Sequence, residues 1–433
     1  MHHAILRCLI AATVVLALAA PPAGASNLAD LIPNLLGTEI RLAPPTGPFP
    51  SHAAHFRDES LALAATGRTL DQSLGQQFSS VPLANSAGGF SYTLDPALGT
   101  FTRNTDSFGP VFTERALTIG RGKLNLGFNY LQASYDKLDD LSLDSGAIQF
   151  QLGHQDVPGA NFFEGDVIGV RTFLDLKSRT GVFFANYGVT DRIDVGVAVP
   201  IVKVDIDARA ELKINRLSTA GQPTIHVFTN GTDSERLTAS DSASGVGDVV
   251  LRGKLRVADW FATALDVRLP TGDEKNLLGT GFTQTKLTLL ASGSFGRAGL
   301  HSNLGYSVAS GNSSVLSDLP DELSYALGLD VAVHPRVTVA AEVLGRTLYD
   351  VTRVVSTQVS HSFQAGPGGP IQTTQLPQVT FARADQHLFY GSLGAKFNPG
   401  GNLLVSADAL IPLSNDGLQA KGVVTVVGLE YSF

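Results

Sequence analysis

The chain has 433 residues, of which 45 are Gly and only 16% are charged, and its formal net charge is −8. The composition and the single cysteine, Cys8, argue against a disordered chain and against a scaffold held by disulfides or zinc. Net negative charge disfavours nucleic acid as a partner, and the lack of an apolar run of about 18 residues after residue 25 excludes a helical membrane protein.

Residues 1–25 are expected to be a secretory signal peptide. Arg7 supplies the basic start, an apolar core follows it, and Ala23-Gly24-Ala25 forms a cleavage site of small residues. The mature chain is then expected to begin at Ser26 and to leave the cytoplasm.

Residues 26–121 are predicted to be irregular and partly helical. Helix-like spacing covers residues 27–36 and 56–78, and a small hairpin is expected over residues 90–103. The second helix carries an apolar stripe, formed by Leu63, Leu70, Leu74 and Phe78. The region has too few apolar residues for a core of its own. We therefore expect it either to plug a larger structure or to pack beneath that structure as a periplasmic segment.

From residue 122 to the end, apolar and polar residues alternate with the period of two that β-strands show. Short turns such as Asn398-Pro399-Gly400-Gly401 alternate with long polar connections such as residues 206–244 and 350–385. Short turns at one end and long loops at the other are typical of a transmembrane barrel. Closure also pairs every backbone group in hydrocarbon, which an open sheet cannot do.

The predicted fold is therefore all-β, an antiparallel transmembrane β-barrel over residues 122–433. Twelve strands are expected, over residues 122–136, 173–189, 191–208, 245–258, 259–270, 283–296, 297–311, 321–334, 336–349, 386–398, 401–413 and 419–433. The alternative is fourteen strands, if residues 147–152 and 166–173 span the membrane instead of forming an extracellular hairpin. Either even count places both termini on the periplasmic side.

Several charged residues fall on the strand face that is expected to line the lumen. These candidate lumen residues are Arg252, Lys254, Arg256, Asp266, Arg268, Glu342 and Arg346. Three of the cations follow one strand and Arg268 lies across a turn, so one wall would attract anionic solutes. The alternative is an ordinary polar lumen in which acids balance the cations, namely Asp194, Asp248, Asp266, Glu342, Asp408 and Glu430.

No catalytic, cofactor or metal site is expected. A hydrolase on the barrel needs a nucleophile in contact with a base, whereas His301 and the adjacent Ser302 point to opposite faces of one strand. Ser and His side chains from different strands could still meet, because the sequence does not fix the spacing between strands. Residues 270–281 lack the pattern of a phosphate-binding or calcium-binding loop.

The C-terminus and four internal runs resemble known outer-membrane proteins. Tyr431-Ser432-Phe433 resembles the signal that hands such proteins to the barrel-assembly machinery, with Tyr431 and Phe433 as its aromatic residues. The other runs resemble the family named for the phenol meta-cleavage degradation pathway, and they cover residues 107–120, 187–200, 245–248 and 269–274. That family is distantly similar to long-chain fatty-acid channels, and the resemblance implies passive passage of hydrophobic compounds.

We therefore predict a channel in the outer membrane of a Gram-negative bacterium for passive uptake of small hydrophobic or aromatic compounds. Its expected partners are outer-membrane lipid, the barrel-assembly machinery and a small-molecule solute, and residues 26–121 are expected to act as a plug or gate from the periplasmic side. The alternative is a structural or surface-interaction barrel that acts through residues 206–244 and 350–385, whose β-branched runs extend the strands above the membrane.

Overall fold

The computed structural model describes residues 27–43, 56–78, 89, 92–95, 100–103, 106–154, 165–221 and 225–433. The predicted signal peptide, residues 1–25, lies outside the described residues.

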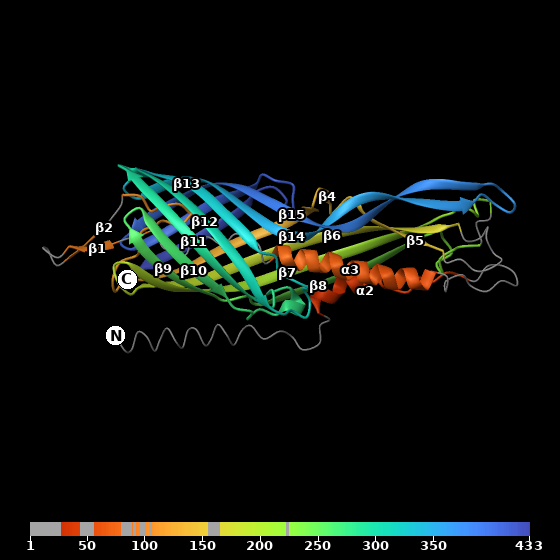
Figure 1. Ribbon diagram of the computed structural model, residues 1–433, viewed down its shortest axis with the longest axis horizontal. Helices are drawn as coiled ribbons and strands as arrows, with labels where there is room; N and C mark the ends of the chain where they lie inside the picture. Colours follow the sequence, from red (N-terminus) through yellow and green to blue (C-terminus); the bar gives the residue numbers. More distant parts are fainter. Residues whose placement is uncertain are drawn as a thin grey trace.

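A closed antiparallel β-barrel forms the body of the molecule (Figure 1). In the described part of the chain, twelve strands pair in a ring: β3 (Leu124–Leu138), β6 (Val167–Gly188), β7 (Ile193–Asn215), β9 (Val250–Ala258), β10 (Phe261–Arg268), β11 (Phe282–Phe295), β12 (Ala298–Gly311), β13 (Glu322–His334), β14 (Val337–Gln364), β15 (Ile371–Gly400), β16 (Leu403–Pro412) and β18 (Val424–Ser432). The ring closes because β3 pairs with both β18 and β6. The prediction of a twelve-stranded antiparallel barrel is confirmed.

Four further strands in the described residues extend the barrel wall at its long-loop end: β4 (Leu141–Ser142), β5 (Ile148–Gly153), β8 (Ser234–Val246) and β17 (Leu418–Ala420). The strand β5 pairs with residues 167–172 of β6 and takes the place beside β6 that β3 occupies further down. Residues 147–152 and 166–173 therefore form a hairpin that lengthens the wall, and the alternative of fourteen spanning strands is wrong. The strands β14 and β15 also continue far beyond the ring as one paired hairpin.

Along the barrel, the apolar side chains of a strand change from its outward face to its inward face. In the half near the short turns, Val195 of β7 is 44% exposed on the outside and the adjacent Asp194 is buried inside. In the long-loop half of the same strand, Asp207 is exposed and Ile206 is buried. Many other apolar side chains face outward in the short-turn half, among them Phe183, Leu251, Leu287, Leu327 and Leu429. The outward apolar band marks the part of the barrel that suits hydrocarbon.

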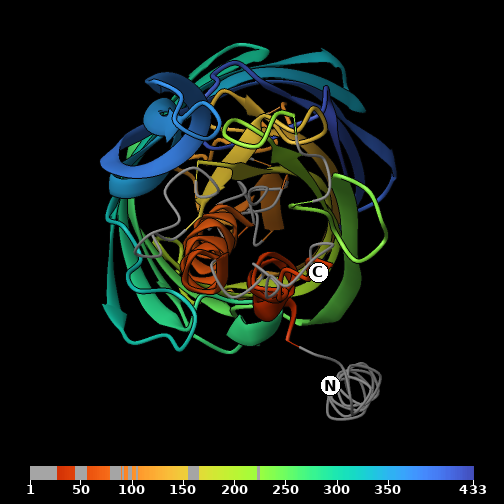
Figure 2. The same cartoon turned by 90° about the vertical axis from the view of Figure 1, so that its right-hand side faces the viewer.

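Helices fill the interior at the long-loop end, where they lie inside the ring of strands (Figure 2). They are η1 (Leu28–Asp30), α2 (Leu31–Leu36) and α3 (Arg57–Phe78). Leu63, Leu70 and Leu74 are at most 5% exposed and share one apolar cluster with inward side chains of β6 and β7. The structure contains helices over both ranges where the sequence predicts them. The side chain of Phe78, the last member of the predicted stripe, lies outside the described residues.

Two small features complete the described elements. The strands β1 (Tyr92–Asp95) and β2 (Thr100–Arg103) pair as the predicted hairpin, close to the short-turn end (Figure 1). A single helical turn, η3 (Glu274–Asn276), lies in the connection between β10 and β11. None of the helices in the described residues has the length and hydropathy to cross a membrane.

Candidate functional site in the lumen

Residues 106–121, which we name the inner segment, cross the lumen near the short-turn end without pairing as a strand. Side chains from the wall replace the partners that a neighbouring strand would offer to the backbone. Backbone N–H groups along the whole segment donate to them, among them Ile119 to Asp194 (3.0 Å), Ala116 to Ser292 (2.9 Å), Glu114 to Asn303 (2.7 Å), Val111 to Glu342 (2.7 Å) and Phe108 to Thr338 (2.9 Å). The inner segment is thus fastened around much of the ring.

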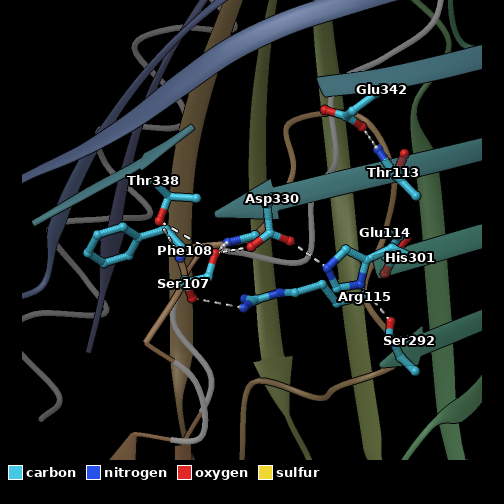
Figure 3. A network of polar contacts seen from close by, with 12 residues as sticks. Ser107, Phe108, Thr113, Glu114, Arg115, Ser292, His301, Asp330, Thr338 and Glu342 are labelled. Carbon is cyan, nitrogen blue, oxygen red and sulfur yellow. Dashed lines mark hydrogen bonds and ion pairs between the residues drawn. The ribbon is translucent and has the colours of Figure 1, made fainter. Parts of the chain in front are cut away.

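Glu342 of β14 makes the densest of these attachments. Its carboxylate accepts hydrogen bonds from the backbone N–H groups of Val111, Phe112 and Thr113, and the residue is only 3% exposed. Figure 3 shows the bond from Thr113. Successive N–H groups that converge on one anion form a concave site for negative charge. Here the protein supplies its own carboxylate, so this site holds the chain in place.

A second attachment is ionic and joins the inner segment to β9. Lys254 donates to the backbone oxygens of Arg115 (2.6 Å) and Leu117 (2.7 Å) and pairs with the Glu114 carboxylate at 3.2 Å. Arg252 pairs with the same carboxylate and makes two hydrogen bonds to Asp266. Two of the predicted cations therefore share one acid of the inner segment, and they do not form an open row toward the lumen.

Ser292, His301 and Asp330 form a hydrogen-bonded relay across β11, β12 and β13 (Figure 3). The Ser292 hydroxyl lies 2.8 Å from Nδ1 of His301, and Nε2 of His301 lies 2.6 Å from the Asp330 carboxylate. No sequence signal pointed to this cluster, because only the strand register brings the three residues together. Ser302 faces away from the relay, on the opposite face of β12.

The relay has the residue types of a hydrolase, but its other contacts end on the inner segment. The Ser292 hydroxyl accepts the N–H of Ala116, and Asp330 accepts the hydroxyl of Ser107. The serine oxygen is therefore engaged by the backbone, whereas a nucleophile needs a free approach to its substrate. The contacts of Ser292 and Asp330 therefore fit a role in holding the inner segment to the wall better than a role in catalysis. Within the described residues, no group of three or more His, Cys, Asp or Glu side chains is placed to hold a metal ion.

A cavity of about 240 Å³, the central chamber, lies on the long-loop side of the inner segment. One wall is charged and is formed by Arg252, Asp266, Arg268, Lys286, Glu322 and Arg346, with Glu114 below it. Across the ring from β14, Val182 and Phe184 of β6 form an apolar wall, with Phe112 of the inner segment also in the lining. Leu344 adds an apolar side chain on β14, two residues before Arg346. The chamber therefore offers a solute both a cluster of charged side chains and, on β6, apolar side chains.

The structure places the candidate lumen residues in two groups. Arg252, Asp266, Arg268 and Arg346 line the central chamber, whereas Lys254 and Glu342 contact the inner segment. Arg256 lies two residues beyond Lys254 on the same face of β9. The acids of the alternative interpretation, Asp194, Asp248, Asp266, Glu342, Asp408 and Glu430, are all buried. Sequence reasoning did not single out Glu114, Lys286 or Glu322, which complete the charged wall. The role of each residue in passage stays a prediction.

The C-terminal aromatic residues lie at the seam where the ring closes. The rings of Tyr431 and Phe433 are 4.7 Å apart, and both side chains are more than 40% exposed. The backbone N–H of Phe433 donates to the Leu124 carbonyl at 2.7 Å, beside the start of β3. Their part in assembly stays a prediction.

A closed barrel with an outward apolar band, a polar lumen and short turns at one end is an outer-membrane β-barrel. Residues 169–384 match the family described as the MetA-pathway of phenol degradation, so the predicted resemblance to that family is confirmed. No curated protein matches the chain.

Solved structures similar to this chain are remote from it in sequence. An outer-membrane channel from Pseudomonas putida F1 is 14% identical, with a TM-score of 0.41, over 73% of this chain and 98% of the other. A FadL homologue from Pseudomonas aeruginosa is 12% identical, with a TM-score of 0.32, over 81% and 97%. The toluene transporter TbuX of Ralstonia pickettii is 13% identical, with a TM-score of 0.28, over 72% and 90%.

Proposed function

We propose that this protein is an outer-membrane channel, not an enzyme, and that small hydrophobic or aromatic compounds diffuse through it into the periplasm. The central chamber carries the proposal, because it is a cavity inside a membrane barrel whose lining includes the apolar side chains of Phe112, Val182, Phe184 and Leu344. An apolar cavity of about 150 Å³ is large enough to bind benzene. At about 240 Å³, the chamber has room for one substituted aromatic ring.

Two obstructions would control passage through the lumen. The inner segment crosses it near the short-turn end, and the helices α2 and α3 occupy the long-loop end (Figure 2). The region 26–121 thus supplies both obstructions in this proposal, one above and one below the chamber. A solute would pass when one of them shifts, and the inner segment is the better candidate because wall side chains, not strand pairing, hold it.

The proposed orientation places the short turns and both chain ends in the periplasm. Bacterial outer-membrane barrels have short periplasmic turns and longer extracellular loops. The outward charges on the far half of β7, such as Asp207, then lie above the lipid, while Val195 faces it. Lipid, the solute and, during assembly, the barrel-assembly machinery are the partners we propose.

Uptake by whole cells tests the channel, because the lipopolysaccharide leaflet hinders hydrophobic solutes that would cross a simple liposome unaided. Gram-negative cells without a hydrophobic-compound channel of their own would express the full chain and receive radiolabelled toluene, a long-chain fatty acid or a charged sugar. We expect faster entry of toluene and unchanged entry of the sugar. If none of the three enters faster although the folded barrel is present in the outer membrane, the channel proposal fails.

A second function is favoured by the hairpin of β14 and β15, which projects beyond the rest of the barrel (Figure 1). It exposes Ile371 by 79% and Val355 by 41%, so it presents apolar side chains to any surface that approaches. Deletion of residues 355–380 separates the two functions. Unchanged toluene uptake together with a loss of cell-to-cell adhesion would assign the hairpin a surface-binding role.

A further inference from the structure

We propose that the central chamber selects monocyclic aromatic carboxylates, with the ring against its apolar wall and the carboxylate against its cations. This inference rests on the proposed channel function and narrows the class of solute. It starts from a feature of the charged wall, where positive side chains outnumber negative ones although the whole chain has a net charge of −8.

The excess is seen by counting the charged residues that line the chamber within the described part of the chain. Four are cations, Arg252, Arg268, Lys286 and Arg346, and three are anions, Glu114, Asp266 and Glu322, which leaves a surplus of one positive charge. Asp248, a buried acid that does not line the chamber, interacts electrostatically with Arg268, so the surplus describes the lining of the chamber and not its wider surroundings. Other buried acids are engaged elsewhere. Glu342, for example, accepts backbone N–H groups of the inner segment.

Lys286 makes only a long ion pair with its partner Glu322. Glu322 accepts hydrogen bonds from both Nε and Nη2 of Arg346, whereas the Nζ atom of Lys286 lies 3.9 Å from the same carboxylate. One acid therefore serves two cations. In addition, Nη1 of Arg346 is buried without a hydrogen-bond partner. The side chain of Lys286 keeps 31% of its surface exposed, so an incoming carboxylate can reach it beside Arg346 and form the close ion pair that Glu322 does not make with it.

The apolar wall on β6 determines which uncharged group of the ligand fits the chamber. Phe184 lies across Gly127, where its ring atoms come within 2.2–2.7 Å of the place that a Cβ would occupy. The absence of a side chain at Gly127 therefore gives the Phe184 ring its space beside β3. Aromatic rings bind such surfaces through offset-stacked or edge-to-face contacts. An aromatic ring can therefore bind beside Phe184, and the volume of about 240 Å³ is sufficient for one ring and one carboxylate.

Binding to the purified full-length protein in detergent tests the proposal directly. Isothermal titration would compare benzoate with benzamide, which has the same shape without the charge, with benzylamine, which carries the opposite charge, and with acetate, which lacks the ring. We expect benzoate to bind at least about tenfold more tightly than each of the other three, a difference of about 1.4 kcal/mol. Equal affinity for benzoate and benzamide would overturn the charge selection.

Substitutions in the chamber test where benzoate binds. Lys286→Gln is expected to weaken benzoate binding about tenfold, and Lys286→Arg to retain it because the charge remains. The matched control removes two cations from the outside of the wall, where Arg179 and Lys203 pair with Asp205. The double variant Arg179→Gln and Lys203→Gln should bind benzoate normally. Full benzoate affinity in folded Lys286→Gln and in folded Arg346→Gln would place the site elsewhere.

Failure of this inference can be told apart from failure of the channel. If toluene enters cells through the protein but benzoate binds no better than benzamide, the selectivity is wrong and the channel stands. If benzoate binds with the expected preference but no solute enters cells, the chamber is a binding site and the channel proposal fails.

Discussion

In the short-turn half of β7, Val195 faces outward and Asp194 faces inward, whereas in the long-loop half Asp207 faces outward and Ile206 inward. The pairing of β7 with β6 continues without a shift over this whole length. The apolar face of β7 therefore changes sides through the choice of side chains alone, without a change in backbone pairing. It shows where the surroundings of the barrel change from hydrocarbon to water, and where its filling changes from polar to apolar.

The two halves also hold their contents by different interactions. In the short-turn half, hydrogen bonds and ion pairs to residues such as Glu342 and Lys254 fasten the inner segment. In the long-loop half, α3 is held mainly by burial of Leu63, Leu70 and Leu74. Charge changes should therefore loosen the inner segment, and loss of apolar volume should loosen the helix.

The largest effect is expected from Leu70→Ala in α3. Leu70 is fully buried in the apolar cluster, and a buried Leu→Ala change costs about 2–5 kcal/mol. Hydrogen exchange of the α3 amides in detergent would report the loss as faster local opening. Arg68→Ala, at an exposed position of the same helix, serves as the control. Equal exchange in both variants would mean that α3 is not held by this cluster.

A slightly smaller effect is expected on the outside of the short-turn half. Leu327 is 53% exposed on the outward face of β13, and an Arg on the lipid face costs about 2–4 kcal/mol near the bilayer midplane. Leu327→Arg should lower the free energy of unfolding in lipid by that amount. Val359→Arg, on the far hairpin of β14, should cost little because water surrounds it. Similar costs for both variants would contradict the position of the apolar band.

Loosening of the inner segment is the third expected effect. Glu342→Ala removes the acceptor for three backbone N–H groups, and an orphaned buried donor costs about 1–3 kcal/mol. We expect a higher single-channel conductance in planar bilayers. Asp408→Ala is the matched control, because it also removes a buried lumen carboxylate but one that is hydrogen-bonded to Ser392 of the wall. A conductance raised equally in both variants would point to charge alone.

Strand positions could be predicted from the sequence because alternation continues through each strand in both halves of the barrel. In β7 the apolar face changes sides, but Val195 and Ile206 each still alternate with polar or small neighbours. The stripe of Leu63, Leu70 and Leu74 likewise predicted a helix with a buried side. Both signals are periodic, and the structure contains the elements they indicate.

The attachments of the inner segment could not be predicted in the same way. Residues 106–121 have no periodic pattern, because the barrel wall and not a repeating backbone fixes their course. The relay of Ser292, His301 and Asp330 depends on the register of three strands, which a single sequence does not give. Arg252 and Lys254 were recognised as lumen residues, but their shared partner Glu114 lies far away in the chain.

The smallest effect concerns a buried carboxylate at the long-loop end, outside the spanning part of the wall. Asp166 is fully buried and accepts hydrogen bonds from the backbone N–H groups of Ser218 and Thr219 and from Nδ1 of His226 (2.7 Å). Burial by itself raises the pKa of Asp166, but the hydrogen bonds from His226 and Thr219 outweigh it and hold this pKa below its usual value.

A lowered carboxylate pKa stabilises the folded state above the unfolded-state pKa, which is about 4 for Asp, and this stabilisation is lost as the pH falls through the folded-state value. Residues 165–221 and 225–228 should therefore become more open to protease when the pH drops below about 4. In Asp166→Asn the side chain no longer titrates, so this segment should be less protected at pH 7 and should lose little more protection in acid. Protease sensitivity of the folded barrel, measured from pH 7 downward, checks both statements. Parallel pH curves for the two proteins would show that Asp166 does not control this connection.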